Sequence, residues 1–459
     1  MKLFEICFLQ LEKLYLRAKA SSANEILLGI YLFIYGFLFL NYQALSSDEI
    51  INFDISRTYN FFSNNAPPGN TGAIFWTLLG IIPSFQIARV IFYVLLITSV
   101  FLICEIGDKD TKKSIFLLML YISMPFAFWT GKILSPEIVL LFLISLALKI
   151  SPRKQLIAYI VLGVAIGIKL TAIPALVYLA LSNLELKFLT RKIGYVILSV
   201  LVAALTNVFN IKRFVQSLLF SEQTSPQVEN ISKMRIILFD NLKSWDSVQI
   251  GSLGHLLIHP IIVVLILITG FLIKTRDVLA FSCAFSCALL LIWLSPSGFG
   301  WYWIPFIPVL FNFLSKIYND LKEKSKSNII LFLGCSLMLL INASYNVETS
   351  YAAVAEKVSH IQTIKNLDQK CINMYLNKND SKRVYNITDF GVNLQVSNIS
   401  YREVITGQFE VINSTMKPGI IIISNRLMGN EYFLRSVISS ERIIEIKGQC
   451  KSMYILEVR

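Results

Sequence analysis

The chain has 459 residues, of which 55% are hydrophobic and only 15% are charged, and its formal net charge is +13. A soluble domain carries roughly a quarter of charged residues, so this composition, with a mean hydropathy of +0.62, argues against an ordinary soluble enzyme. Apolar runs of the ~20 residues needed to cross a bilayer recur from residue 24 to residue 346 and predict a polytopic helical membrane protein. The basic residues lie mostly in short loops between these runs, where the positive-inside rule accounts for them better than nucleic-acid binding does.

Residues 1–23 are predicted to form a cytoplasmic amphipathic helix on the membrane surface. Their apolar residues recur at helical spacing, at Phe4, Cys7, Phe8, Leu11 and Tyr15. The stretch has no small-residue cleavage site, so a secretory signal is not expected. Lys13, Arg17 and Lys19 precede the first apolar run, which predicts a cytoplasmic N-terminus.

Residues 24–346 are predicted to form an all-α transmembrane domain of about eleven helices. Nine of these are expected at about 24–42, 85–106, 114–130, 137–149, 193–208, 253–273, 278–296, 303–317 and 328–346. The other two are short helices broken near Lys169 and Pro174, because a single crossing there would leave the following basic loop outside. Residues 43–84 and 209–252 then form external loops.

Residues 347–459 lack long apolar runs and are predicted to form a small extracytoplasmic α/β domain. Short β-branched runs, such as GIIIIS and SMYILEV, alternate there with stretches of helical pattern. Cys371 and Cys450 are the two cysteines of this segment, and they would meet an oxidising compartment. They are either a disulfide that joins the two ends of the domain or two unrelated thiols.

The first external segment contains the acidic pair of ALSSDEIINFDISRTYNFFS, Asp48 and Glu49. Ser46 and Glu49 have the spacing of a capping box, and Asp48 would lie in the first turn of the helix. On that interpretation the acids only start an interfacial helix. A second external turn, GKILSPEIVLLFL, brings Lys132 and Glu137 to the same face, and ionisable groups at two such positions favour a functional pocket at the bilayer surface.

The order of these motifs resembles that of the GT-C membrane glycosyltransferases. The similarity is to the superfamily of protein O-mannosyltransferases and lipid A aminoarabinose transferases, glycosyltransferase family 39-like. It is carried by SSDEIINFDISRTYNFF, NNAPPGNTGAIFW, GKILSPEIVLLFL and GVAIGIKLTAIPAL, and by the later GFGWYWIPFIPVLF. It covers residues 43–180 well, is weaker up to residue 320 and is absent from the tail.

The resemblance implies transfer of a hexosyl or pentosyl group, with inversion, from a polyprenyl-phosphate carrier to a glycan, lipid or protein acceptor on the external face. The key acid of the family falls on Asp48, which would act as the general base. A lipid phosphate is a good leaving group and needs cations and hydrogen-bond donors rather than a second acid.

Six further residues are candidates for substrate binding, each with a structural alternative. Arg57 and Lys132 are expected to contact phosphate, unless they snorkel from a helix or flank a span. Glu137 is expected to orient the acceptor or a divalent cation, and Glu49 lies beside the base. The last two are His255 and Tyr302.

His255 and His259 lie one helical turn apart, a spacing that suits a metal, but polar contacts at a span mouth are favoured because no third ligand is visible. No protein metal site is therefore predicted. Tyr302 is expected to stack on a sugar or prenyl chain, while an aromatic belt explains Trp301 and Trp303 without a function. The chain has Asn65 and Ala66 where relatives carry a charged residue or histidine before the Pro-Pro turn.

Three other functions compete with sugar transfer. A polysaccharide polymerase would use the same face and donor type. A transporter or flippase of lipid-linked substrates would show internal repeats and mid-membrane polar residues, and the break near Lys169 is the feature that fits it. A non-catalytic envelope scaffold is the third. The Asn-, Lys- and Ile-rich composition suits a bacterial inner membrane.

Overall fold

The structure is a computed structural model of the whole chain. It describes residues 29–30, 53, 56–57, 71–106, 110–123, 134–182, 188–208, 260–294, 300–323, 370–376, 383–387, 401–404, 419–424, 444–450 and 453–458. The expected N-terminal helix and the expected spans at about 24–42 and 328–346 lie outside these residues, apart from Gly29 and Ile30.

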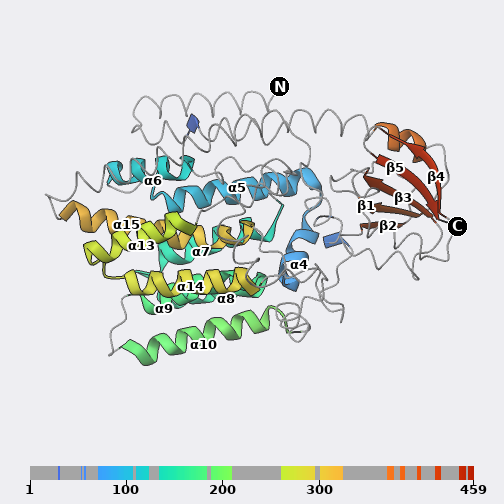
Figure 1. The fold of residues 1–459 in the computed structure, drawn as a ribbon. Helices are drawn as coiled ribbons and strands as arrows, with labels where there is room; N and C mark the ends of the chain where they lie inside the picture. Colours follow the sequence, from blue (N-terminus) through green and yellow to red (C-terminus); the bar gives the residue numbers. More distant parts are fainter. Residues whose placement is uncertain are drawn as a thin grey trace, which may run out of the picture.

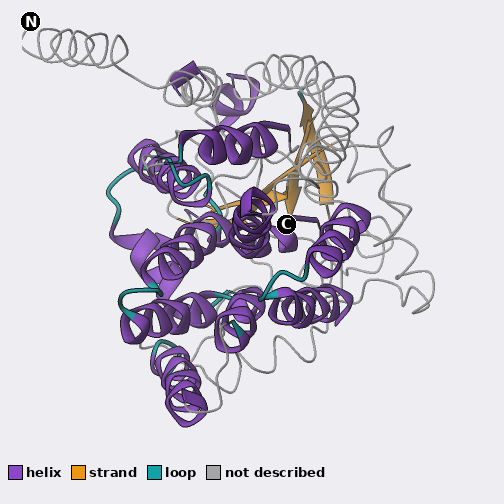
Figure 2. Ribbon diagram, turned by 90° about the vertical axis from the view of Figure 1, so that its left-hand side faces the viewer, coloured by secondary structure: helices purple, strands orange, loops and turns teal. Residues whose placement is uncertain are grey.

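The described part consists of a bundle of helices and a separate five-stranded sheet (Figure 1). The helices of the bundle are α4 (Ala73–Ile81), α5 (Phe85–Ile103), α6 (Thr111–Ser123), α7 (Pro136–Ile150), α8 (Gln155–Ile168), η2 (Leu170–Ala172), α9 (Ile173–Leu181), α10 (Leu189–Leu205), α13 (Pro260–Ile273), α14 (Val278–Leu294), η7 (Gly300–Phe306) and α15 (Ile307–Glu323). Figure 2 looks along the bundle, so most of these helices are seen end-on.

The helices α5, α7, α10, α13 and α14 coincide to within a few residues with helices predicted from the sequence, and residues 253–259 before α13 lie outside the described residues. Their ends carry ordinary stop and start signals. The Ser84 hydroxyl accepts a hydrogen bond from Ile87 N at the start of α5, and Pro136 occupies the first turn of α7. Among the described residues, α5 is the one helix long and apolar enough to cross a membrane, with 19 residues and a mean hydropathy of 2.1.

Two helices end in the same C-terminal capping motif. Glu105 follows α5 with φ 51° and Lys274 follows α13 with φ 59°. In each case the next N–H reaches back five residues, from Ile106 to the Phe101 carbonyl at 3.1 Å and from Thr275 to the Gly270 carbonyl at 2.9 Å. This is the Schellman pattern, which usually places glycine at the left-handed residue.

Two segments and one side chain differ from the sequence prediction. Helix α4 lies inside the segment expected to be an external loop. The predicted span at about 303–317 begins instead with the 3-10 helix η7, which contains Pro305, and α15 then continues to Glu323. Trp303 is only 4% exposed and packs on Phe285 and Phe306, so the aromatic-belt interpretation is wrong for this residue.

Helix α7 lies at the centre of the bundle and packs against α5, α8, η7 and α15. It is apolar around most of its circumference, as expected for a fully surrounded helix. Helix α10 lies at the edge of the bundle (Figure 1) and exposes large apolar side chains, among them Ile197, Val200 and Leu205. An outer surface of this kind suits contact with lipid chains.

The predicted break between two short helices is confirmed. Helix α8 ends at Ile168, Lys169 has an extended backbone, and the chain resumes through η2 into α9. The start of α8 and the end of α9 line the same cavity, since Gln155 and Ser182 both face it. The pair therefore returns the chain to the end of the bundle from which it came.

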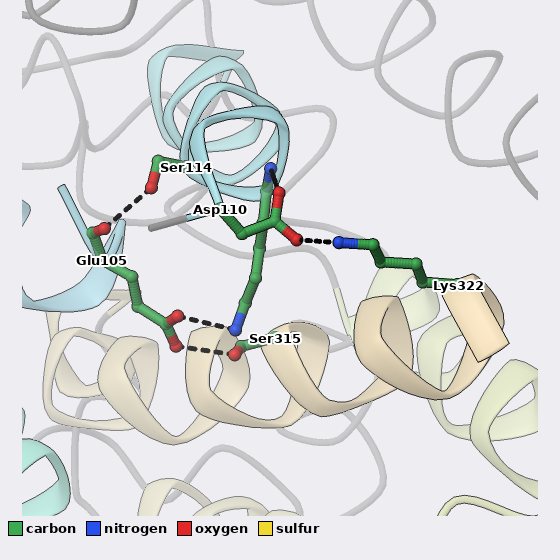
Figure 3. A network of polar contacts seen from close by, with 6 residues as sticks. Glu105, Asp110, Ser114, Ser315 and Lys322 are labelled. Carbon is green, nitrogen blue, oxygen red and sulfur yellow. Dashed lines mark hydrogen bonds and ion pairs between the residues drawn. The ribbon is translucent and has the colours of Figure 1, made fainter. Parts of the chain in front are cut away.

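The loops predicted to be cytoplasmic meet at one end of the bundle, which we call the basic end. There Lys113 pairs with Glu105 at 2.6 Å, Lys322 pairs with Asp110 at 2.7 Å, and the Ser315 hydroxyl donates to Glu105 at 2.6 Å (Figure 3). Lys316 also forms an ion pair with Asp277. These contacts tie α15 to the loops that follow α5 and α13.

The sheet confirms the predicted α/β character of the tail. Its strand order is β2-β1-β3-β5-β4, formed by β1 (Arg383–Ile387), β2 (Tyr401–Val404), β3 (Gly419–Ser424), β4 (Ile444–Gln449) and β5 (Met453–Val458). Strands β2, β1 and β3 are parallel, while β5 is antiparallel to its two neighbours. The runs GIIIIS and MYILEV form β3 and β5.

A small core holds residues 370–376, which are helical, against this sheet. It contains Ile372, Leu376, Ile420, Ile422, Cys450 and Ile455. Cys371 and Cys450 are joined by a disulfide with a Cα–Cα distance of 5.9 Å, so the covalent link runs from that helix to the end of β4. Figure 1 places the sheet beyond the end of the bundle where α4 lies.

Candidate active site

A buried ion pair lies at the end of the bundle opposite the basic end. Glu137 is in the first turn of α7, and its Oε1 contacts Nζ of Lys169 at the break between α8 and η2. The two residues are 2% and 7% exposed. Glu137 lies in the first turn of α7, where the helix dipole attracts a negative charge, and its carboxylate compensates the lysine. We call this end of the bundle the ion-pair end.

The segment before α4 is fixed directly beside this pair. Gly72 N donates to the Ile168 carbonyl at 2.7 Å, one residue before Lys169. A Cβ at Gly72 would lie 1.8 Å from the Gly167 carbonyl oxygen, so only glycine permits this approach. The end of the motif NNAPPGNTG, which carried part of the resemblance, therefore borders the ion pair.

Asn207 joins three elements at the same place. Its side-chain oxygen accepts a hydrogen bond from Ala73 N at 3.2 Å, and its amide nitrogen donates to the Gly167 carbonyl at 2.8 Å. The start of α4, the end of α8 and the end of α10 are thus held by one buried amide, which is 1% exposed. Buried polar groups used in this way specify a single arrangement of the backbone.

Two arginines flank an aromatic pair at this end. The Arg57 guanidinium lies 4.7 Å from the ring of Phe53, and the Arg89 guanidinium lies 5.9 Å from the ring of Phe85. The two rings meet edge to face with their centroids 5.6 Å apart. Arg57 also donates to the Gly80 carbonyl at 3.3 Å and to the Ile82 carbonyl, so it satisfies the C-terminal end of α4.

Two buried hydroxyls adjoin the ion pair in the sequence. Ser135 Oγ precedes Glu137 by two residues, and Thr171 Oγ1 follows Lys169 by two residues. Within the part of the chain that the structure describes, neither atom has a hydrogen-bond partner. Buried hydroxyls are normally paired, so these two are unusual polar groups beside the ion pair.

The structure describes three of the seven catalytic and substrate-binding candidates. Glu137 forms the ion pair, Arg57 caps α4, and Tyr302 lies in η7, where only its backbone is described. The other four lie outside the described residues, namely Asp48, Glu49, Lys132 and His255.

Sequence reasoning missed Lys169, Arg89 and Asn207 as site residues. Lys169 stands out as the one charged residue between Gln155 and Leu181, but the sequence indicates only a helix break there, which a transporter could also use. Arg89 lies within the long apolar run of α5 and is only 8% exposed, which is a signal of a functional charge. Asn207 carries no such signal.

Comparison with solved structures defines the class of protein. The chain is similar to the structure described as "Crystal Structure of ArnT from Cupriavidus metallidurans bound to Undecaprenyl phosphate", with a TM-score of 0.50 and 12% sequence identity, over 95% of this chain and 98% of that chain. The fold is therefore that of the GT-C membrane glycosyltransferases, and the expected class is confirmed. The expected count of about eleven spans stays a prediction.

Residues 67–296 match the profile of glycosyltransferase family 87, and the chain belongs to that family. The motifs had suggested the family 39-like branch of the same GT-C class, so the family assignment is refined while the class is unchanged. The chain is thus a membrane glycosyltransferase. No curated protein sequence gives a significant match.

Proposed function

We propose that this protein transfers a sugar from a polyprenyl-phosphate carrier to an acceptor of the bacterial envelope. Membership of glycosyltransferase family 87 supports the reaction class, and the ArnT structure of similar fold binds undecaprenyl phosphate. The observation that carries the proposed location is the buried pair of Glu137 and Lys169 beside the motif at Gly72. Charged groups at such depth are costly and are kept where they serve a site.

The proposed step is an inverting displacement at the anomeric carbon. Asp48 takes the proton from an acceptor hydroxyl, whose oxygen forms the new bond to the anomeric carbon. The bond between that carbon and the phosphate oxygen breaks, and its electron pair leaves with the polyprenyl phosphate. A leaving group that carries negative charge requires cationic and hydrogen-bonding partners rather than a second acid.

Cations of the ion-pair end supply these partners. Arg57 uses two of its nitrogens on carbonyl groups at the end of α4 but remains exposed, so its other N–H groups can reach a phosphate. Lys132 is the second proposed phosphate contact, and Arg89 is a third. Glu137 fixes the position of Lys169. The further proposed role of Glu137 is to orient the acceptor or a divalent cation. His255, Glu49 and Tyr302 complete the proposed contacts.

The distribution of basic residues supports a sidedness for this chemistry. Lys113, Arg191, Lys316 and Lys322 gather at the basic end, which the positive-inside rule assigns to the cytoplasm. The ion-pair end and the domain of residues 347–459 then face the outside of a bacterial inner membrane. The described pieces of sheet and the Cys371–Cys450 disulfide agree with an oxidising compartment.

The test is sugar transfer by membranes that contain the full chain, with labelled polyprenyl-phosphate hexose and a panel of envelope acceptors. Asp48→Asn is compared with wild type and with Asp54→Asn, a matched control in the same acidic segment. We expect transfer by wild type and by Asp54→Asn, and a loss of at least ~100-fold for Asp48→Asn at equal expression, as for removal of a general base.

Two results would count against the proposal. Full activity of Asp48→Asn would make the acidic pair a helix cap. An inactive wild type with every donor, combined with movement of the lipid-linked sugar across the membrane, would favour the flippase alternative. A product that lengthens with time as a repeating polymer would instead identify the polymerase alternative.

A further inference from the structure

A cavity lies at the basic end, remote from the proposed sugar-transfer site. Its volume is about 390 Å³, within the usual range of about 300–1,000 Å³ for a small-molecule site. It is lined by the end of α7, the start of α8, the end of α9, the start of α10 and the middle of α15. Helix α7 has 15 residues, so its two ends, and with them the two sites, are about 22 Å apart.

The lining has a clear charge preference. Arg191, Lys192 and Lys316 are among the described residues that line the cavity, and none of those residues is acidic. Lys192 is 8% exposed, and its Nζ donates to the Ala180 carbonyl at 3.1 Å and to the Ser182 carbonyl. Lys316 is paired with Asp277, which offsets one of the three charges. The net character of the lining is cationic.

A buried hydroxyl gives the second, independent indication of a ligand. Tyr159 lines the cavity and is 2% exposed, and its hydroxyl has no hydrogen-bond partner within the described residues. Its ring packs in a tilted arrangement against that of Tyr195, with the ring centroids 5.3 Å apart, and the Tyr195 hydroxyl accepts a hydrogen bond from Arg191 Nε at 2.7 Å. An unpaired phenol beside cationic donors is a site for an anionic oxygen.

The apolar surface beside the cavity indicates what kind of anion it takes. Phe188, which lines the cavity, is 44% exposed, and it is followed on α10 by Ile193 and Ile197 at 49% and 54%. A free phosphate ion gains nothing from contact with this apolar surface, whereas the acyl chains of a lipid pack against it. Anionic phospholipids are also concentrated in the cytoplasmic leaflet, where basic residues attract them.

We propose that this cavity binds the phosphate of an anionic phospholipid, with the acyl chains along the outer face of α10. Arg191, Lys192 and Lys316 provide the positive field, and Tyr159 donates a hydrogen bond to a phosphate oxygen. The site lies at the opposite end of α7 from Glu137, away from the proposed sugar-transfer site. The proposal therefore stands or falls independently of the transfer reaction.

The experiment is native mass spectrometry of the full chain in detergent, titrated with phosphatidylglycerol, with phosphatidylcholine and with phosphatidylglycerol in the presence of inorganic phosphate. We expect phosphatidylglycerol to bind at least fivefold more tightly than phosphatidylcholine, and inorganic phosphate at tenfold excess to displace none of it. Arg191→Gln and Tyr159→Phe should each weaken phosphatidylglycerol binding by about fivefold, the effect of one basic side chain or one hydrogen bond.

Arg153→Gln is the matched control, because Arg153 is an exposed basic residue at the same end that does not line the cavity. Binding unchanged in both Arg191→Gln and Tyr159→Phe would overturn the proposal, as would an equal loss in Arg153→Gln, which would indicate general surface charge. Displacement by inorganic phosphate would overturn it in favour of a soluble anion. The thermal midpoint of each variant, measured in the same detergent, verifies that it is folded.

Discussion

At the scale of single residues, the pair of Glu137 and Lys169 has a structural role, and a role in the proposed chemistry can be tested separately. Neither residue can be buried alone, because an uncompensated charge in the interior costs several kcal/mol. Together they hold the start of α7 against the break after α8. The pair therefore fixes the backbone around the proposed site, whether or not either residue contacts substrate.

We expect Lys169→Met to lower the thermal midpoint of the detergent-solubilised protein strongly, since removing one partner of a buried pair costs about 3–5 kcal/mol. The double variant Glu137→Gln/Lys169→Met removes both charges and should recover most of this loss. Thermal unfolding of the three proteins tests the expectation, with Lys322→Met as control because the side chain of Lys322 is 64% exposed. A double variant no more stable than Lys169→Met would show that the two charges do not compensate each other.

The sugar-transfer activity of the folded double variant distinguishes a structural role of the pair from a role in substrate contact. Sugar transfer near the wild-type rate would limit the pair to a structural role. A folded but inactive double variant would assign substrate contact to Glu137, to Lys169 or to both.

Sequence reasoning identified Glu137 but not its partner, and the reason is physical. The two residues are 32 positions apart, so their contact exists only once α7 and α8 have packed. Each charge taken singly has an ordinary explanation, a helix N-terminus for Glu137 and a helix break for Lys169. Arg57 was expected at a phosphate and is found at the end of α4, a role that depends on a helix the sequence pattern did not indicate.

At the scale of elements, the start of α4 and the end of α8 approach each other too closely to admit a side chain at Gly72. A Cβ at Gly72 meets the backbone oxygen of Gly167, which cannot rotate away, whereas a Cβ at Gly194 on α10 has nothing within 4 Å. The span ends were predictable because apolar runs stop at charged residues, glycine or proline. Helix α4 was not, because its nine residues follow a Pro-Pro turn and were taken with the external loop.

We expect Gly72→Ala to destabilise the protein by about 1–3 kcal/mol, the usual cost of forcing extra atoms into a packed contact. Gly194→Ala, the matched control, should be neutral or should stabilise α10 by up to about 1 kcal/mol through helix propensity. Thermal unfolding in detergent distinguishes them. Equal midpoints for the two variants would mean that α4 moves aside without cost.

The contact between Asp110 and Lys322 gives stability a pH dependence at the basic end. The hydrogen bond from Lys322 lowers the pKa of the Asp110 carboxyl below its ordinary value of 3.8. A carboxyl with a lowered pKa in the folded state stabilises the protein above pH 3.8, and the contribution is lost as the pH falls through the lowered pKa. The side chain of Lys322 is largely exposed, so the effect is small.

Asp110→Asn should therefore have a slightly lower thermal midpoint than wild type at pH 7, and the difference should shrink as the pH falls below 3.8. Parallel thermal scans at several pH values check this expectation. A difference that persists unchanged at the lowest pH would show that the effect does not come from the charge of Asp110. The hydrogen bond from Lys113 N would not explain it either, since the Asn side chain keeps an acceptor oxygen.

At the scale of the whole molecule, the chain consists of a membrane bundle of helices and a C-terminal sheet that a disulfide joins to its own helix of residues 370–376. The sequence indicated both parts, because hydropathy distinguishes them directly, and it indicated strands β3 and β5 by their β-branched runs. It could not indicate the order of the strands, which depends on contacts among segments distant in the chain.

We expect alkylation under denaturing conditions to label two more cysteines after reduction than before, out of the seven in the chain, and to map both to Cys371 and Cys450. The disulfide spans 79 residues, so its loss in Cys371→Ser/Cys450→Ser should cost the sheet about 2–5 kcal/mol. Mass spectrometry of the labelled protein is the measurement. Two free thiols in protein isolated from its oxidising compartment would contradict the pairing.

The shortness of the central helices has a consequence for how a substrate arrives. From Glu137 to the end of α7 is 14 residues, or about 21 Å, whereas the hydrocarbon core of a bilayer is ~30 Å thick. If the proposed sidedness holds and α7 runs along the membrane normal, the ion pair would lie roughly 9 Å below the external interface. A carrier lipid that floats with its phosphate among the headgroups must then sink, or the bilayer around the enzyme must be thinned. On this geometry, membrane thickness is expected to influence turnover, and the enzyme should work faster in bilayers of short-chain lipids.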